Sequence, residues 1–165
     1  MKRLICLSLL LLAAFGCAVL KPSPEEEAAA KQRLEQCLNE QKFRIEIDYM
    51  MPRRSSGRSV TGSYSLSVDG SDIRSNLPYF GVAYSIPYGG GKVLTFEDKI
   101  DRYSDSGWRK GRRIISLLTN NDEDVIVYTI TVFEDGTADI SVHPRNREDI
   151  SYRGKIHTEK SLSEN

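Results

Sequence analysis

The stretch NLPYFGVAYSIPYGGGK, residues 76–92, ends in glycines and a lysine and therefore first suggests a phosphate-binding loop. Such a loop needs a wide Gly-x4-Gly turn between a strand and a helix, and a Ser or Thr after the lysine to hold magnesium. Here the three glycines are contiguous and Lys92 is followed by Val93. The phosphate-loop hypothesis fails, and the glycines are better explained as turn residues with positive φ angles.

The aromatic residues of this stretch offer a second chemistry, a binding rim. The two prolines of the stretch, Pro78 and Pro87, lack backbone N–H donors. We therefore predict that the stretch forms an edge strand, or two short strands joined by an irregular crossing. Because successive side chains of an extended chain face opposite ways, we expect Phe80 and Tyr84 to pack in the core. Tyr79 and Tyr88 then lie partly exposed beside a shallow groove. The alternative is that all four aromatic residues of the stretch only pack against the fold and turn the chain.

Nucleophilic and metal chemistry find little support. A thiol nucleophile would need Cys37 to pair with His143 or His157, held by a third group. Cys37 instead falls on the apolar stripe of a predicted helix, where a small buried hydrophobe is the commoner role. The acidic stretches SVDGSD, NNDED and FEDGTAD do not match the register of a calcium loop. We therefore predict no catalytic residue, no metal ligand and no cofactor.

Basic residues cluster in three predicted loops. If alternate loops collect at one end of a sheet, these clusters form an anion-binding rim. We select Trp108, Arg109 and Arg112, together with Tyr79 and Tyr88, as candidate ligand-binding residues. Solvated loop charge, neutralised by nearby acidic residues, is the alternative. The clusters are Arg53, Arg54 and Arg58; Arg109, Lys110, Arg112 and Arg113; and Arg145 with Arg147.

The N-terminus has the order of an export signal. Two basic residues precede an apolar run that ends at Phe15, and Gly16-Cys17 follow. The run is too short for a lasting membrane span, which takes about 20 apolar residues. We predict a signal peptide at residues 1–16, acylation of Cys17 and a tether at residues 17–24. Secretion without a lipid, and retention as an uncleaved anchor, are the alternatives.

Composition bounds the mature chain to one domain. Cleavage before Cys17 leaves about 149 residues, with 21 basic against 23 acidic side chains. A net charge near −2 and an exported location give no reason to expect nucleic acid as a partner. Only Cys37 then remains in the body of the domain, so no internal disulfide forms and the fold depends on burial.

Periodicity predicts a mainly β (α+β) fold. Residues 25–42 are mostly strong helix formers with a narrow apolar stripe, and residues 43–157 alternate apolar and polar side chains between hairpin turns. We expect the N-terminal helix to pack on an antiparallel β-meander of about eight strands, as an open curved sheet or a barrel-like shell. Residues 158–165 are expected to form a flexible tail. The alternating runs are 43–49, 64–68, 126–132, 138–142 and 150–156.

Four stretches resemble a known family: PRRSSGRSVTGSYSLSVDGSDIRSNLPYFGVAYSIPYGGG, DKIDRY, FEDGTADISV and NREDISYRGKI. Together they resemble the domain of unknown function 4251 family of small envelope lipoproteins from Bacteroidales-type bacteria. The resemblance spans about Phe43 to Ile156 and supports export, but it implies no activity, ligand or catalytic residue. The residues that match the family's motif are Leu77, Pro78, Tyr79, Phe80, Gly81, Pro87 and Tyr88.

The leading functional hypothesis is a non-enzymatic, lipid-anchored cell-envelope protein on the periplasmic or outer-membrane face. It would bind a small molecule, a glycan or a protein partner, and contact the membrane through the acyl chains on Cys17. Two alternatives belong to other classes. One is a hydrolase with an unidentified site, and the other is an inhibitor of an extracytoplasmic enzyme that presents a rigid loop.

Overall fold

The computed structural model describes residues 23–84 and 94–157. Within these ranges the chain begins with helix α2 (Pro24–Asn39), which starts at a capping box. The Ser23 hydroxyl accepts from the Glu26 N–H at 3.2 Å, and the Glu26 carboxylate accepts from the Ser23 N–H at 2.7 Å. The helix ends three residues before the predicted boundary, because Gln41 adopts a left-handed conformation (φ 53°) that turns the chain into the first strand.

The strands form one antiparallel sheet, which confirms the predicted fold class. Nine of them lie side by side in the order β5-β4-β3-β1-β10-β9-β8-β7-β6, and β2 pairs with β1 off this path. The first and last long strands are therefore neighbours in the middle of the sheet, and the connection from β5 to β6 joins its two edges. The strands are β1 (Lys42–Pro52), β2 (Arg58–Ser59), β3 (Ser65–Asp69), β4 (Asp72–Asn76), β5 (Thr95–Lys99), β6 (Arg102–Arg109), β7 (Arg112–Asn120), β8 (Val125–Phe133), β9 (Thr137–Pro144) and β10 (Ile150–His157).

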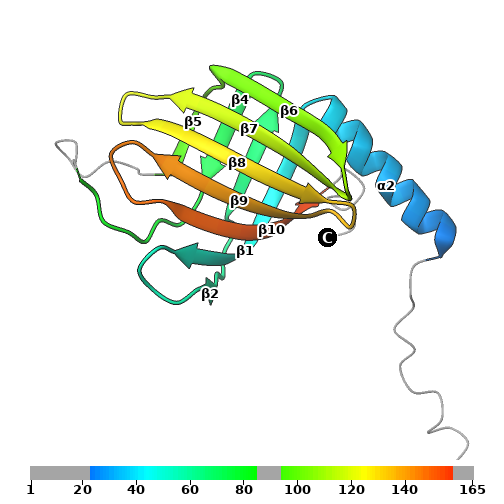
Figure 1. The fold of residues 1–165 in the computed structure, drawn as a ribbon, viewed down its shortest axis with the longest axis horizontal. Helices are drawn as coiled ribbons and strands as arrows, with labels where there is room; N and C mark the ends of the chain where they lie inside the picture. Colours follow the sequence, from blue (N-terminus) through cyan, green and yellow to red (C-terminus); the bar gives the residue numbers. More distant parts are fainter. Residues whose placement is uncertain (1–22, 85–93, 158–165) are drawn as a thin grey trace, which may run out of the picture.

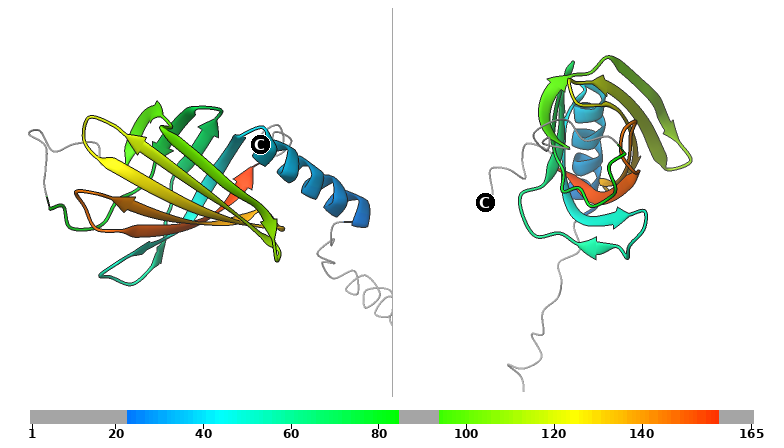
Figure 2. Two further views of the ribbon diagram at one scale, coloured as in Figure 1. Left: turned by 45° about the horizontal axis from the view of Figure 1, so that its top comes forward. Right: turned by 90° about the vertical axis from the view of Figure 1, so that its left-hand side faces the viewer.

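The sheet curls into an open half-barrel, so that β3–β5 cross behind β6–β9 (Figures 1 and 2). Alternate side chains of each long strand point into the space between the two halves and form the core. Tyr128 of β8 donates across this core to the hydroxyl of Ser75 on β4 at 3.3 Å. Burial raises the pKa of Tyr128, so its hydroxyl remains a donor at any physiological pH.

The close packing of β1 against β10 depends on a glycine. A Cβ built on Gly154 of β10 would overlap the carbonyl oxygen of Glu46 on β1. The register of the two strands also shifts between Ile47 and Tyr49, next to the Ile47 partner Gly154. At this irregularity the backbone of β1 therefore approaches β10 more closely than a side chain at position 154 would allow.

Helix α2 lies at one end of the half-barrel. Leu34 and Leu38 are buried against the core, and Lys31 pairs with Glu134 of the β8–β9 turn at 2.9 Å. We call this end, with the β6–β7 and β8–β9 turns and His157, the helix end. The opposite end, which we call the loop end, holds residues 53–57, 77–84, 121–124 and 145–149 (Figure 1). In the described ranges, no helix has the length and hydropathy needed to span a bilayer.

Candidate functional site

The segment after β4 leaves the sheet but is fixed to it at its start. Leu77 is buried, and its N–H donates to the carbonyl oxygen of Leu94 at 3.1 Å. The hydroxyl of Tyr152, a core residue of β10, donates to the carbonyl oxygen of Pro78 at 2.8 Å. The chain therefore enters the loop end from two anchored residues, although a proline at position 78 prevents it from continuing as a paired strand.

Tyr79 and Glu148 clamp the next residues to the β9–β10 loop. The Tyr79 hydroxyl lies 3.0 Å from the Glu148 carbonyl oxygen and 3.3 Å from that of Val82. The Val82 N–H donates to a carboxylate oxygen of Glu148 at 3.2 Å, and the Glu148 N–H donates back to the Val82 carbonyl at 3.0 Å. Ala83 pairs with Arg147 in an isolated β-bridge. The two family motifs that contain these residues, about 70 positions apart in the sequence, thus meet in space.

The Glu148 carboxylate is buried, with 3% of the residue exposed. Its second oxygen lies 2.5 Å from Nε of Arg54, whose side chain is exposed to solvent. A buried carboxylate without a cation or hydrogen-bond donors would be costly, so Arg54 and the Val82 N–H keep it in place. This confirms, for Arg54, that a nearby acidic residue neutralises part of the basic loop charge.

The clamp directs three apolar side chains outward. Phe80, Val82 and Tyr84 are 54%, 47% and 63% exposed, and the Arg58 guanidinium lies 4.2 Å from the centre of the Phe80 ring. Among the described residues only one other large apolar side chain is exposed, Ile114. We call Arg58, Phe80, Val82 and Tyr84 the loop-end surface.

The orientation predicted for Phe80 and Tyr84 is wrong, because both were expected in the core and both are exposed. Tyr79 is partly exposed, as predicted, although its ring also packs against the core. The prediction assumed an extended chain, and the segment instead turns at Gly81, where a Cβ would overlap the Tyr79 ring. Pro78 and Gly81 were the sequence signal for this break. Tyr88 lies outside the described residues, as does Cys17.

Only two of the three basic loops, residues 53–57 and 145–149, lie at the loop end, so the predicted anion rim of three loops is not formed. Arg112 pairs with Phe133, which places the β6–β7 turn beside the β8–β9 turn at the helix end, opposite the segment of residues 77–84 (Figure 1). Trp108 packs against the core, and Arg109 and Arg112 face each other, exposed, across the turn.

Arg113 points inward instead of joining this basic cluster. It pairs with Asp105 on β6, and its Nη1 donates to Asn39 at the end of α2 at 2.9 Å. Burial disfavours ionisation of Asp105, but hydrogen bonds from Arg113 and from the Gly107 N–H outweigh it and lower the pKa of Asp105. Arg113 therefore fixes the end of the helix rather than a ligand.

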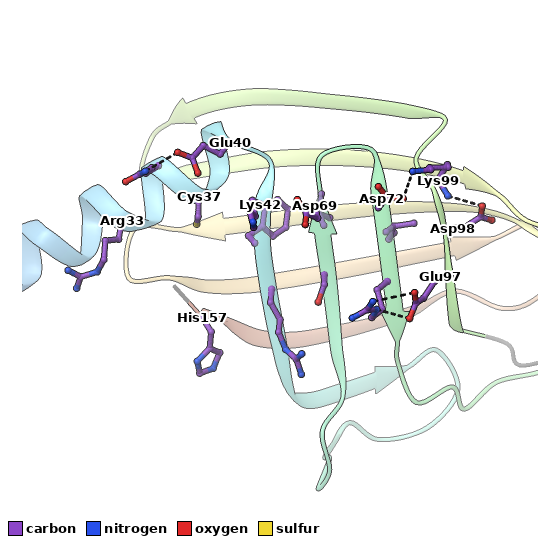
Figure 3. Close-up of a pocket in the computed structure, with 17 residues that line it drawn as sticks. Arg33, Cys37, Glu40, Lys42, Asp69, Asp72, Glu97, Asp98, Lys99 and His157 are labelled. Carbon is purple, nitrogen blue, oxygen red and sulfur yellow. Dashed lines mark hydrogen bonds and ion pairs between the residues drawn. The ribbon is translucent and has the colours of Figure 1, made fainter. Parts of the chain in front are cut away.

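A second candidate site lies beside α2 at the start of β1, which we call the helix-side pocket (Figure 3). Its volume is about 930 Å³, within the range of ligand-binding clefts. Its side chains come from α2, from β1, β3, β4 and β5, and from His157. Cys37, Phe43 and Val68 supply apolar surface, and charged side chains of both signs surround them.

The sulfur chemistry of this pocket does not suggest catalysis. The Cys37 thiol donates to the Leu34 carbonyl at 3.1 Å, and burial raises the pKa of Cys37. A reactive thiol needs the opposite shift. His157 lies 3.1 Å from Glu46, and His143 lies 3.2 Å from Asp149 near the loop end. In the part of the chain that the structure describes, no three His, Cys, Asp or Glu side chains gather as metal ligands.

Comparisons with known proteins show the family. A crystal structure of a DUF4251 family protein from Bacteroides eggerthii DSM 20697 has a similar fold, with a TM-score of 0.57 and 18% identity over 82% of this chain and 93% of that chain. No curated protein matches the chain. The model of the family described as "Domain of unknown function (DUF4251)" matches residues 25–156, so the chain belongs to the DUF4251 family.

Proposed function

We propose that this chain is an exported, lipid-anchored envelope protein that binds a protein partner through the loop-end surface, without catalysing a reaction. The observation that carries the proposal is the outward orientation of Phe80, Val82 and Tyr84 on a backbone that is held by hydrogen bonds. Three of the four exposed large apolar side chains in the described ranges lie on this one segment. Exposed apolar side chains gathered in one place are typical of interaction sites.

The composition of the surface favours a protein over a small molecule. Aromatic residues and arginine carry most of the binding energy at protein interfaces, and burial of one large apolar side chain contributes about 1.5–3 kcal/mol. Because the Tyr79–Glu148 clamp already orders the segment, a partner does not have to order it on binding. Arg58 and the neighbouring exposed Arg53 favour a partner with acidic side chains around its apolar contact.

The anchor part of the proposal is supported by the sequence of residues 1–17. The N-terminus enters the fold through α2 at the helix end, and the loop-end surface lies at the opposite end (Figure 1). A lipid on Cys17 would therefore attach the protein to the membrane on the side away from this surface. The partner would be met in the periplasm or outside the cell.

The binding test compares two variants of the mature protein. We expect Phe80→Ser/Tyr84→Ser to weaken binding by roughly 30-fold or more, while Ile114→Ser, which removes the fourth exposed apolar side chain, leaves it unchanged. A partner cross-linked in envelopes is first purified, and the affinity of the defined pair is then measured for all three proteins. The proposal is wrong if the two variants bind equally well, or if a purified pair forms no stoichiometric complex.

The purified complex also distinguishes the proposed binding protein from the other functional classes, an enzyme inhibitor and a glycan-binding protein. If the partner is an enzyme that loses activity in the complex, the chain is an inhibitor that uses the loop-end surface. If a glycan array binds the wild type and no protein does, the surface is a glycan-binding site and the proposed partner class is wrong.

The anchor is tested separately. Mass spectrometry of the mature wild-type protein should find acyl chains on Cys17, and Cys17→Ala should move the protein from the membrane fraction to the soluble fraction or leave it unprocessed. An unmodified N-terminus on the wild-type protein would refute the anchor but leave the binding proposal standing.

A further inference from the structure

The hairpin of β1 and β2 lies beside the clamp at the loop end. Pro52, the last residue of β1, pairs with Ile150, the first residue of β10. The β1–β2 loop (residues 53–57) and the β9–β10 loop (residues 145–149) therefore leave the sheet at the same point (Figure 1). Among the described strands β2 pairs with β1 alone, so the hairpin is attached to the sheet on one side. Contacts with the neighbouring loops therefore decide where its tip lies.

Two contacts join this hairpin to the loop-end surface. The Nε atom of Arg54 lies 2.5 Å from Oε1 of Glu148, and the Arg58 guanidinium lies 4.2 Å from the centre of the Phe80 ring. The other carboxylate oxygen of Glu148 accepts from the Val82 N–H at 3.2 Å. The hairpin is thus connected to the backbone of the clamped segment and to one of the side chains that the clamp directs outward.

Arg54 is the cation that compensates the buried Glu148 carboxylate. The Glu148 side chain is 3% exposed, whereas that of Arg54 is 71% exposed. Oε1 of Glu148 is buried and accepts no aligned hydrogen bond from the described residues, so the ion pair with Arg54 is what it has. The other charged side chains around it face partners of their own: Arg147 lies 3.7 Å from Glu123, Asp149 lies 3.2 Å from His143, and Asp124 accepts from the Asn146 N–H.

The asymmetric burial of this pair gives it a structural effect that an ordinary surface pair lacks. An ion pair between two exposed side chains contributes little to stability, because water solvates both charges when they separate. Here the separation of Arg54 would leave a buried carboxylate with a single N–H donor, which is strongly unfavourable. Glu148 would turn toward water and release the Val82 N–H. The orientation of Val82 therefore depends on the position of the hairpin.

We propose that Arg54 is a positioning residue for the loop-end surface. Its ion pair with Glu148 latches the β1–β2 hairpin onto the clamp, and the partner binds the latched form. The same closure keeps Arg58 against the Phe80 ring, so the latch sets both halves of the surface. The inference rests on the proposed function for the partner, but the latch itself can be measured without one.

The latch is tested by amide hydrogen exchange of Val82 in the mature protein. We expect Arg54→Gln to speed this exchange by roughly tenfold, because the Val82 N–H loses its charged acceptor. Arg54→Lys should keep most of the protection, since lysine keeps the charge. Arg145→Gln removes an exposed arginine of the β9–β10 loop and should change nothing. Unchanged exchange in Arg54→Gln overturns the latch.

A double-mutant cycle shows whether Arg54 acts through Glu148. Glu148→Gln removes the charge that needs compensation, so in that background Arg54→Gln should alter Val82 exchange by less than about twofold. If Arg54→Gln speeds the exchange equally in both backgrounds, the ion pair is not the cause and the proposal is wrong.

The affinity of the purified partner tests the positioning role. Arg54→Gln should lower it by roughly three- to tenfold in the wild-type background and leave it unchanged in the Glu148→Gln background. Arg54→Lys and Arg145→Gln should bind as the wild type does. Faster exchange with unchanged affinity would overturn the positioning role. If no partner binds, the proposed function fails, while the exchange rates still decide whether Arg54 latches the hairpin.

Discussion

The Arg113 guanidinium of β7 holds the Asp105 carboxylate of β6 through both oxygens. Its Nε lies 2.9 Å from each oxygen, and its Nη2 lies 2.5 Å from Oδ2. The same guanidinium donates to Asn39, so one side chain joins the edge of the sheet to the end of α2. The pair is mostly shielded from water, with 8% and 18% of the two side chains exposed.

The first prediction follows from this pair. Arg113→Met should lower the free energy of unfolding by about 2–3 kcal/mol, because it leaves a largely buried carboxylate without its cation. Arg112→Met, one residue earlier and exposed on the other face, should change it by less than about 0.5 kcal/mol. Urea denaturation measures both. If Arg113→Met lowers the free energy of unfolding no more than Arg112→Met does, the Arg113–Asp105 pair adds nothing to the stability of the fold.

The second prediction concerns acid. The pKa of Asp105 is lower in the folded protein than its ordinary value of 3.8, so folding favours the ionised form. The stability that Asp105 contributes is complete above about pH 5 and is lost as the pH falls through the lowered folded value. Urea midpoints from about pH 6 to about pH 2.5 should therefore fall less steeply in Asp105→Asn than in the wild type. Parallel curves would contradict this assignment.

The third prediction tests the clamp at the loop end. Tyr79→Phe removes the hydroxyl that lies within hydrogen-bond distance of the Glu148 and Val82 carbonyls and should cost about 1 kcal/mol of stability. Amide hydrogen exchange of Val82 and Tyr84 should become faster, since both N–H groups bond to the β9–β10 loop. Tyr84→Phe, at an exposed ring, is the control and should change neither quantity.

The fourth prediction compares two glycines. Gly154→Ala should cost more than about 3 kcal/mol or prevent folding, because its Cβ has no space beside the Glu46 carbonyl. Gly111→Ala, at a left-handed turn position (φ 76°) with open space around it, should cost only about 1–2 kcal/mol. The melting temperatures of the two variants show which substitution costs more stability. A mild effect at position 154 would show that β1 and β10 can separate there.

The sequence determined the local structure of this protein. The alternation in residues 126–132 defines a strand with Ile126, Tyr128, Ile130 and Val132 on its buried face, as the structure confirms. The helix formers before residue 42 likewise predict α2, and half-buried Cys37 packs against the core as expected. These features are predictable because a side chain's face depends only on the period of its own element.

Only the tertiary structure decided which elements meet. The pairing of β1 with β10 joins residues that are distant in the sequence, and so does the clamp between Tyr79 and Glu148. The end of the half-barrel at which each basic loop lies also depends on the strand order. Phe80 and Tyr84 point outward because backbone hydrogen bonds to residues 146–148 fix the direction of the segment. The hydrophobicity of the two side chains does not decide their orientation. The Arg54–Glu148 ion pair likewise depends on strand register, which brings together β1 and β10 and hence the loops that hold these two residues, although neither local pattern carries a record of its neighbour.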